Sequence, residues 1–203
     1  FRRVLFRSEV YPQLYPSRRS KEDVYAAIIA DCEVALAKAP AVSYKYRANV
    51  GAANALLAKV YATKPNPDWN KVIQYSDAVI NSGYTLLPTY NFLFDGNHEG
   101  NNESIWEANG EGWSSPIGAW CTSMFQGVDW KKFNTPSNAL NKAFVDSGDN
   151  QRKTASIKRQ NVSWSDNYWP SFQFPFANKL RKTDGTQNFY IFRLGDIILL
   201  KAE

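Results

Sequence analysis

The sequence predicts a mostly α-helical protein, built from tetratricopeptide-like helix hairpins with an irregular, aromatic-rich ligand-binding subregion and short strands. Apolar residues recur at spacings of three and four between residues 20 and 83, which is the helical repeat. Two of these helices form a hairpin of about 34 residues, the length of a tetratricopeptide unit. Five of the seven tryptophans fall after residue 108, in segments that lack this repeat: Trp113, Trp120, Trp130, Trp164 and Trp169.

The first helix is predicted to begin after Ser20. Ser20 and Asp23 have the capping-box spacing, in which the hydroxyl accepts a hydrogen bond from an early amide and the carboxylate favours the helix dipole. The apolar stripe that follows ends before Pro40. Its members are Val24, Ile28, Cys32, Ala35 and Leu36.

The second helix is predicted from about Arg47 to Thr63, with small residues that allow close helix packing. A Pro-Asn-Pro break ends it, Asp68 caps a third helix, and Gly83 stops that helix. One such hairpin cannot bury its own apolar face, so neighbouring helices must stack on it.

Residues 84–188 are predicted to be largely irregular. Residues 104–108 (SIWEA) are typical of a short strand, and a helix is expected near 136–147 with Thr135 as cap and Pro136 in its first turn. No sustained helix is expected from 150 to 188. Residues 189–203 are expected to contain a late helix that begins near Phe192.

The two ends suggest an internal piece of a longer protein. Residues 1–8 fit no periodicity and are interpreted as a translated sequencing scar, with an ordinary basic strand as the alternative; residues 9–203 are then a partial domain. No apolar run approaches the roughly 18 residues of a membrane-spanning helix.

Charge and metal-ligand composition exclude several functions. The net charge is +5, but without the three arginines of residues 1–8 it is 21 minus 19, or +2, and the basic pairs are scattered, so no nucleic-acid partner is expected. One histidine and two cysteines are too few for a zinc site of about four ligands, so no metal or cofactor is expected. Whether Cys32 pairs with Cys121 stays open.

Several stretches resemble the SusD/RagB family. They are RANVGAANALLAKVYAT from Arg47, DWNKVIQYSDAVINSGYTLLPTYNFLF from Asp68, NNESIWE from Asn101 and NFYIFRLGDIILLKAE from Asn188, in the order of the family. The resemblance implies a surface lipoprotein of the outer membrane of Bacteroidota-type bacteria that captures glycans and delivers them to a SusC-like TonB-dependent transporter. It also implies that the signal peptide, the lipidated cysteine and its outer-membrane lipid anchor are missing from this fragment.

Candidate ligand-binding residues are aromatic side chains next to short polar ones, because sugars present flat C–H faces bordered by hydroxyls. The first candidate is the segment that contains Trp164, Asp166, Asn167, Tyr168 and Trp169. Its alternative is that Trp164 and Trp169 anchor a loop onto the helices. The second candidate is Trp113 between glycine and serine, again with packing as the alternative. Trp69 and Trp106 are assigned to packing.

Two other functions compete with glycan capture. A glycoside hydrolase needs two carboxylates about 5–10 Å apart. Glu103, Glu107 and Glu111 recur at a spacing of four, but the strand-like SIWEA and two nearby glycines argue against a helix there, and Glu107 is expected to pair with a basic neighbour or face water. A tetratricopeptide scaffold for a protein partner fits the helices but not the aromatic, Asn-rich half. We therefore expect a non-catalytic protein.

Overall fold

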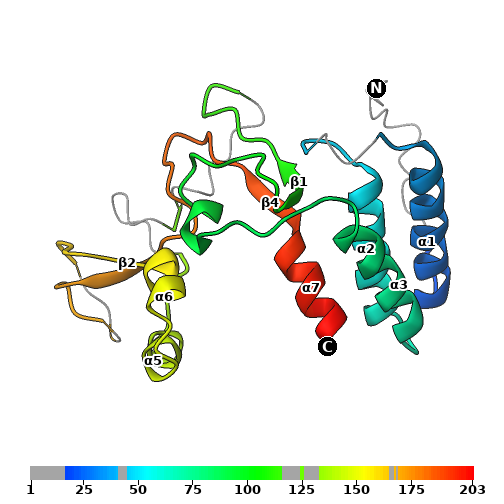
Figure 1. Ribbon diagram of the computed structural model, residues 1–203. Coiled ribbons are helices and arrows are strands. Elements are labelled where there is room, and N and C mark those ends of the chain that lie inside the picture. The colour runs from blue at the N-terminus through cyan, green and yellow to red at the C-terminus, as the bar shows by residue number, and fades with distance from the viewer. Residues whose placement is uncertain (1–16, 41–44, 116–123, 126–132, 165–166, 168) are drawn as a thin grey trace.

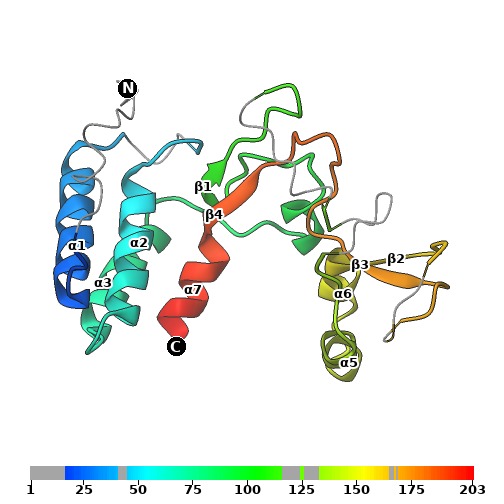
Figure 2. The same cartoon turned by 180° about the vertical axis from the view of Figure 1, so that it is seen from behind.

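The computed structural model describes residues 17–40, 45–115, 124–125, 133–164, 167 and 169–203. A stack of helices lies at one side of the molecule, a two-stranded ribbon lies beside it, and shorter elements form the far side (Figures 1 and 2). This arrangement confirms the predicted mostly α fold with short strands. The stack contains α1 (Lys21–Lys38), α2 (Val50–Thr63), α3 (Trp69–Ile80) and α7 (Leu194–Ala202). The ribbon pairs β1 (Ser104–Ala108) with β4 (Phe189–Arg193), and the far side contains η2 (Tyr90–Leu93), α5 (Asn138–Asp146), α6 (Asn150–Ser156), β2 (Ile157–Gln160) and β3 (Phe174–Ala177).

Helix α1 begins where the sequence places its cap. The Ser20 hydroxyl accepts a hydrogen bond from the Asp23 amide at 3.0 Å, and the helix ends at Lys38, before Pro40. Cys32 is buried against α2 and α3, whereas Val24 is 47% exposed, so the predicted stripe is covered in its middle and open at its start. Cys121 lies outside the described residues.

Helices α2 and α3 form the predicted hairpin. Helix α2 begins at Val50 rather than near Arg47, because the Asn49 side chain accepts a hydrogen bond from the Ala52 amide at 2.8 Å and so caps the helix. Asp68 caps α3 as predicted, by accepting from the Lys71 amide at 3.1 Å. Gly83 follows α3 with a positive φ of 88°, a conformation that glycine adopts without strain.

In the stack α2 contacts α1, α3 and α7, and α3 also contacts α7. Small buried residues of α2 allow this close approach, and the Tyr61 and Tyr75 rings stack between α2 and α3 with centroids 5.7 Å apart. The buried small residues are Gly51, Ala52, Ala53, Ala55 and Ala58.

Of the two tryptophans assigned to packing, only Trp106 is packed. Trp106 packs against the buried cluster around Ile105, and its ring centroid lies 6.2 Å from that of Phe192. The assignment of Trp69 is wrong, since this side chain is 55% exposed. Trp69 is the first residue of α3, at the tip of the hairpin, where the buried stripe ends and solvent reaches the indole.

The β1–β4 ribbon contains the strand predicted at 104–108. It also shows that the last helix begins later than predicted. Residues 189–193 are not helical; they form β4, which pairs antiparallel with β1, and α7 begins only at Leu194. The physical reason is that the backbone of β4 bonds to β1 before the chain turns into the helix. Leu194 and Ile197 then enter the core beside Val79 and Ile105.

The far side contains more regular structure than the sequence predicts. The helix expected near 136–147 is α5, but its cap is Ser137 rather than Thr135, and Pro136 precedes the cap. Residues 150–188 contain the short helix α6, capped by Asp149, and the antiparallel hairpin β2–β3. Helix α6 has only seven residues, too few to show an apolar repeat.

No helix among the described residues is both long and apolar enough to cross a bilayer.

Substitution of Gly51 by alanine tests the close packing of the stack. A Cβ at Gly51 would lie 2.1 Å from the Tyr84 hydroxyl, which is buried. We expect Gly51→Ala to lower the free energy of unfolding by about 1–3 kcal/mol, measured by urea denaturation. Adding Tyr84→Phe, which removes the clashing atom, should recover part of the loss. Wild-type stability in Gly51→Ala would contradict this packing.

The buried Tyr84 also predicts a dependence on alkaline pH. Burial raises the pKa of Tyr84 to about 12, above the value of about 10 in an unfolded chain. The folded state therefore binds this proton more tightly, and the stability from Tyr84 is complete below pH 10 and lost as the pH rises toward 12. Thermal melts between pH 9 and 12 should show a smaller decline for Tyr84→Phe than for the wild type; equal declines would contradict the assignment.

Candidate functional site

Two buried glutamates join segments that are distant in sequence: Glu103, which directly precedes β1, and Glu107 within it. Glu103 accepts hydrogen bonds from Arg193 Nη1 at 2.7 Å and from the Leu87 amide at 3.0 Å. Glu107 accepts from the Gly100 amide at 3.0 Å and from Asn188 Nδ2 at 2.9 Å. The expectation that Glu107 faces water is wrong, because Glu107 is 1% exposed. Its hydrogen bonds come from a side-chain amide and a backbone N–H, and its basic neighbour is Lys45, with which it interacts electrostatically.

These contacts give both carboxylates a structural role. Glu111, the third member of the spacing, is exposed and accepts hydrogen bonds from Ser115 Oγ and Asn109 Nδ2. Among the described residues, no group of three or more His, Cys, Asp and Glu side chains could hold a metal ion.

The same ribbon is bonded to the helical stack. Asn49 Nδ2, at the cap of α2, donates to the Ile105 carbonyl at 3.0 Å, and Lys45 Nζ donates to the Ser104 carbonyl at 2.5 Å. Burial lowers the pKa of Lys45, while the nearby Glu107 acts in the opposite direction. Burial also raises the pKa of Tyr190, whose hydroxyl accepts from Asn101 Nδ2. These bonds connect the ribbon to the helical stack.

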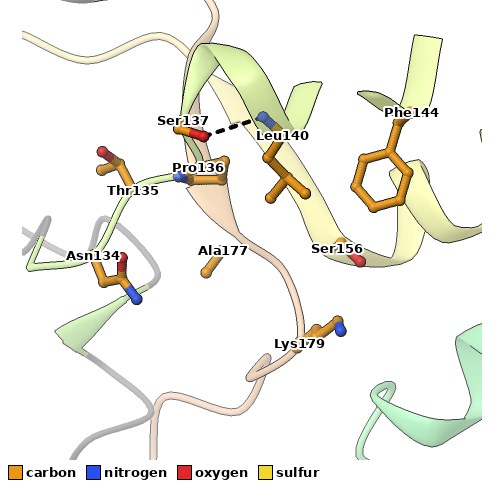
Figure 3. Close-up of a pocket in the computed structure, with 9 residues that line it drawn as sticks. All are labelled: Asn134, Thr135, Pro136, Ser137, Leu140, Phe144, Ser156, Ala177 and Lys179. Atoms are coloured by element: carbon orange, nitrogen blue, oxygen red, sulfur yellow. Dashed lines mark hydrogen bonds between the residues drawn. The ribbon is translucent and has the colours of Figure 1, made fainter. Parts of the chain in front are cut away.

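A surface cavity of about 420 Å³ lies at the start of α5 (Figure 3). Asn134 and Thr135 lie on one side of it, on the chain that enters α5, and Phe144 lies on the other side, on the helix itself. The remaining lining residues come from four different segments, so the cavity exists only in the folded chain. They are Pro136, Ser137, Leu140, Ser156, Ala177 and Lys179.

A second cavity of about 370 Å³ adjoins the first and shares Thr135, Pro136 and Ser137 with it. It adds Trp169 together with the first residues of α5. We name the two cavities together the α5 groove. An indole thus lines the same groove as hydroxyl and amide side chains.

Trp169 is positioned by a basic side chain of β2. The guanidinium carbon of Arg159 lies 5.0 Å from the Trp169 ring centroid, within the range of cation–π contact. The same guanidinium donates to the Gln173 carbonyl and to Asn141 Oδ1, both at 3.1 Å. Arg159 therefore connects β2, the β2–β3 connection and α5 around the indole.

Trp164 lies against the β2–β3 hairpin. Its ring meets Phe174 edge-on with centroids 4.8 Å apart and Phe176 with centroids 6.0 Å apart, and both phenylalanines are fully buried. This geometry favours the packing alternative for Trp164. Asn167 is exposed on the same connection, whereas Asp166 and Tyr168 lie outside the described residues.

Trp113 belongs to a different part of the irregular half. It is 51% exposed, and its indole Nε1 donates to the Thr183 carbonyl at 2.8 Å. Figure 1 shows the segment after β1 and the connection between β2 and β3 at different ends of this half. Trp113 therefore contacts the 183–185 loop and does not line the α5 groove.

The α5 groove includes residues that the sequence did not indicate. Asn134, Ser137, Phe144 and Lys179 line it, and none of them is among the ligand-binding residues predicted from the sequence. The sequence Asn-Thr-Pro-Ser signals the start of a helix, and the polar side chains of such a start are the one signal that points to this surface.

Comparison with known proteins supports the fold. No protein-family model matches the chain, and a search of curated proteins gives no match. Among solved structures, a SusD superfamily protein from Bacteroides thetaiotaomicron VPI-5482 is 22% identical, with a TM-score of 0.75 over 95% of this chain and 44% of that one. A SusD superfamily protein from Bacteroides vulgatus ATCC 8482 is 20% identical, with a TM-score of 0.66 over 91% and 45%.

A third solved structure is the surface glycan-binding protein A from Bacteroides thetaiotaomicron in complex with laminarihexaose. It is 16% identical, with a TM-score of 0.69 over 89% of this chain and 49% of that one. The chain spans about half the length of these structures. It has the SusD-like fold that the sequence resemblance predicts.

Removal of the Glu103 charge tests the ribbon. We expect Glu103→Gln to lower the free energy of unfolding by about 2–4 kcal/mol, because Arg193 loses its ionised partner at a buried site. Glu111→Gln, the same change at an exposed position, should stay within about 0.5 kcal/mol of wild type. Equal effects of the two substitutions in chemical denaturation would contradict the structural role of Glu103.

Proposed function

We propose that this chain binds oligosaccharides or polysaccharides in the α5 groove and holds them without cleaving them. The observation that carries the proposal is the presence of Trp169 in a groove also lined by Asn134, Thr135 and Ser137. An aromatic plane accepts the apolar C–H face of a sugar ring, and amide and hydroxyl groups bind the hydroxyls at its border.

The proposed ligand-binding residues keep the set that the sequence indicated. Trp169 is the stacking platform, and Asn167, Asp166 and Tyr168 supply polar and aromatic contacts from the same connection. Trp164 packs against the rings of Phe174 and Phe176 and so supports that connection. Trp113 is a separate, secondary contact for a longer glycan.

Solved structures with the same fold support the ligand class. One is described as a surface glycan-binding protein in complex with laminarihexaose. Another, 22% identical with a TM-score of 0.72 over 94% of this chain and 47% of that one, was determined with a xylogluco-oligosaccharide. For this chain, glycan binding is inferred from the ligands of these structures together with the geometry of the α5 groove.

Capture without cleavage is supported by the state of the carboxylates. A glycosidase needs one carboxylic acid and one carboxylate that reach the bond being cut. Glu103 and Glu107 are instead buried and hydrogen-bonded within the ribbon, and neither lines the α5 groove.

We extend the proposal to the cellular setting that the family resemblance implies. The protein would act at the surface of the outer membrane as a lipoprotein and deliver glycans to a SusC-like TonB-dependent transporter. The sources of the structures with this fold, which are species of Bacteroides, are consistent with that setting.

Alanine substitution of Trp169 tests the proposal. We expect Trp169→Ala to weaken binding of the retained glycan roughly tenfold in calorimetry or affinity electrophoresis, with little change in melting temperature. The matched control is Trp69→Ala, which removes an exposed indole from α3 and should leave binding unchanged. Trp164→Ala should chiefly lower the melting temperature, because Trp164 packs on the hairpin.

Three outcomes would contradict the proposal in different ways. Unchanged binding in Trp169→Ala would remove the α5 groove as the site. Shorter sugars in the product analysis would support a hydrolase. No retention of any glycan in a broad panel would favour the scaffold alternative.

A further inference from the structure

The positive charge of the chain is concentrated in the part that forms the α5 groove. Residues 134–182 contain eight lysines and arginines and three acidic residues, whereas the rest of the chain contains 16 of each sign. This part therefore carries a net charge of 8 minus 3, or +5, and the rest of the chain, with the three arginines of residues 1–8, is neutral overall. Folding brings the basic residues of this part together around β2, β3, α5 and α6.

Part of this charge is neutralised by neighbouring carboxylates. Lys142 pairs with Asp146 at 2.6 Å, Arg152 pairs with Asp149, and Lys182 pairs with Glu99 at 3.5 Å. These pairs lie on the outer turns of α5 and α6 and beside the ribbon. None of the three cations lines the α5 groove.

Two other cations adjoin the α5 groove and have no carboxylate partner among the described residues. Lys179 lines the first cavity, and its ammonium lies 5.0 Å from the ring centroid of Phe94 and 5.7 Å from that of Tyr90. Arg159 lies over Trp169 of the second cavity, and its hydrogen bonds within the described part of the chain go to the neutral Gln173 carbonyl and Asn141 amide oxygens. No Asp or Glu is among the described residues that line either cavity.

We propose that the α5 groove selects acidic glycans, whose sugar rings carry a uronate carboxylate or a sulfate ester, over neutral ones. This inference rests on the proposed glycan binding and names the class of ligand. The juxtaposition that carries it is an indole with Arg159 over its ring in one cavity and Lys179 in the adjoining cavity, with no carboxylate among the described residues that line either.

The donor chemistry fits an anionic ring. A guanidinium has five N–H donors and an ammonium has three, so both keep donors for a ligand oxygen beyond their present contacts. Lys179 has a flexible stem and can turn its ammonium toward the groove, whereas Arg159 is fixed by its two hydrogen bonds. Neither cation has a carboxylate partner in the described part of the chain, and an acidic glycan would supply an anionic one.

The experiment compares glycans of similar length that differ in charge, by calorimetry with the 203-residue chain. The probes are oligogalacturonate for the carboxylate, a sulfated galactan fragment for the sulfate, and a xyloglucan or laminarin oligosaccharide as the neutral arm. We expect at least one acidic probe to bind about tenfold more tightly than the neutral probes, and this preference should shrink in high salt. The arm that binds more tightly identifies the anionic group.

Charge-removing variants locate the effect. Lys179→Gln and Arg159→Gln should each reduce the affinity for the acidic probe about five- to tenfold and leave neutral binding unchanged. Lys142→Gln is the matched control, because it removes the same charge from the exposed face of α5, away from the groove. Circular dichroism melts identify any variant that fails to fold; in that case the conservative Lys179→Arg and Arg159→Lys variants are compared instead.

Each contrary result overturns a different part of the proposal. Equal or tighter binding of the neutral probe overturns the acidic preference but leaves the proposed function intact. Binding of neither class overturns both. Equal losses in all three Gln variants, or equal binding of a DNA oligonucleotide with the same number of charges, would indicate attraction to the general positive charge and overturn the assignment to the α5 groove.

Discussion

The structure depends on two buried carboxylates, one directly before β1 and one within it. Glu103 and Glu107 bind Arg193 and Asn188 from the end of the chain, and the backbone amides of Leu87 and Gly100 from the preceding loop. A buried carboxylate that lost these donors would carry a desolvation cost of several kcal/mol, so the segments are held in one arrangement. The ribbon thus joins the helical stack to the irregular half of the molecule.

The position of the α5 groove follows from this connection. Asn188 and Gln187 continue from the ribbon into the 178–187 segment, where the Gln187 side chain accepts from the Arg181 and Lys182 amides. Arg181, whose pKa is lowered by burial, then donates to Asn91 of η2 and to the Ala155 carbonyl of α6. The groove therefore rests on a chain of hydrogen bonds that begins at β1, and its shape does not depend on α5 alone.

Features set by local sequence could be predicted, and features set by distant pairing could not. The caps Ser20 and Asp68 and the strand 104–108 follow from a few adjacent residues, and the structure contains them. The bond between Glu103 and Arg193 joins residues 90 positions apart, and no local pattern contains it. Trp69 was expected to pack because it opens α3 directly after the cap, but at the end of the hairpin it is exposed. The aromatic composition near residue 169 indicated one wall of the candidate site, while Phe144 and Lys179 reach the groove only through the tertiary fold.

The central claim is that a SusD-like fold presents a sugar-binding groove at the start of α5. A crystal structure of this chain with a bound oligosaccharide tests it most directly. The account predicts an ordered sugar ring against Trp169, with hydrogen bonds to side chains among Asn134, Thr135 and Ser137. An oligosaccharide ordered elsewhere, for example only at Trp113, with no sugar density in the α5 groove, would contradict it.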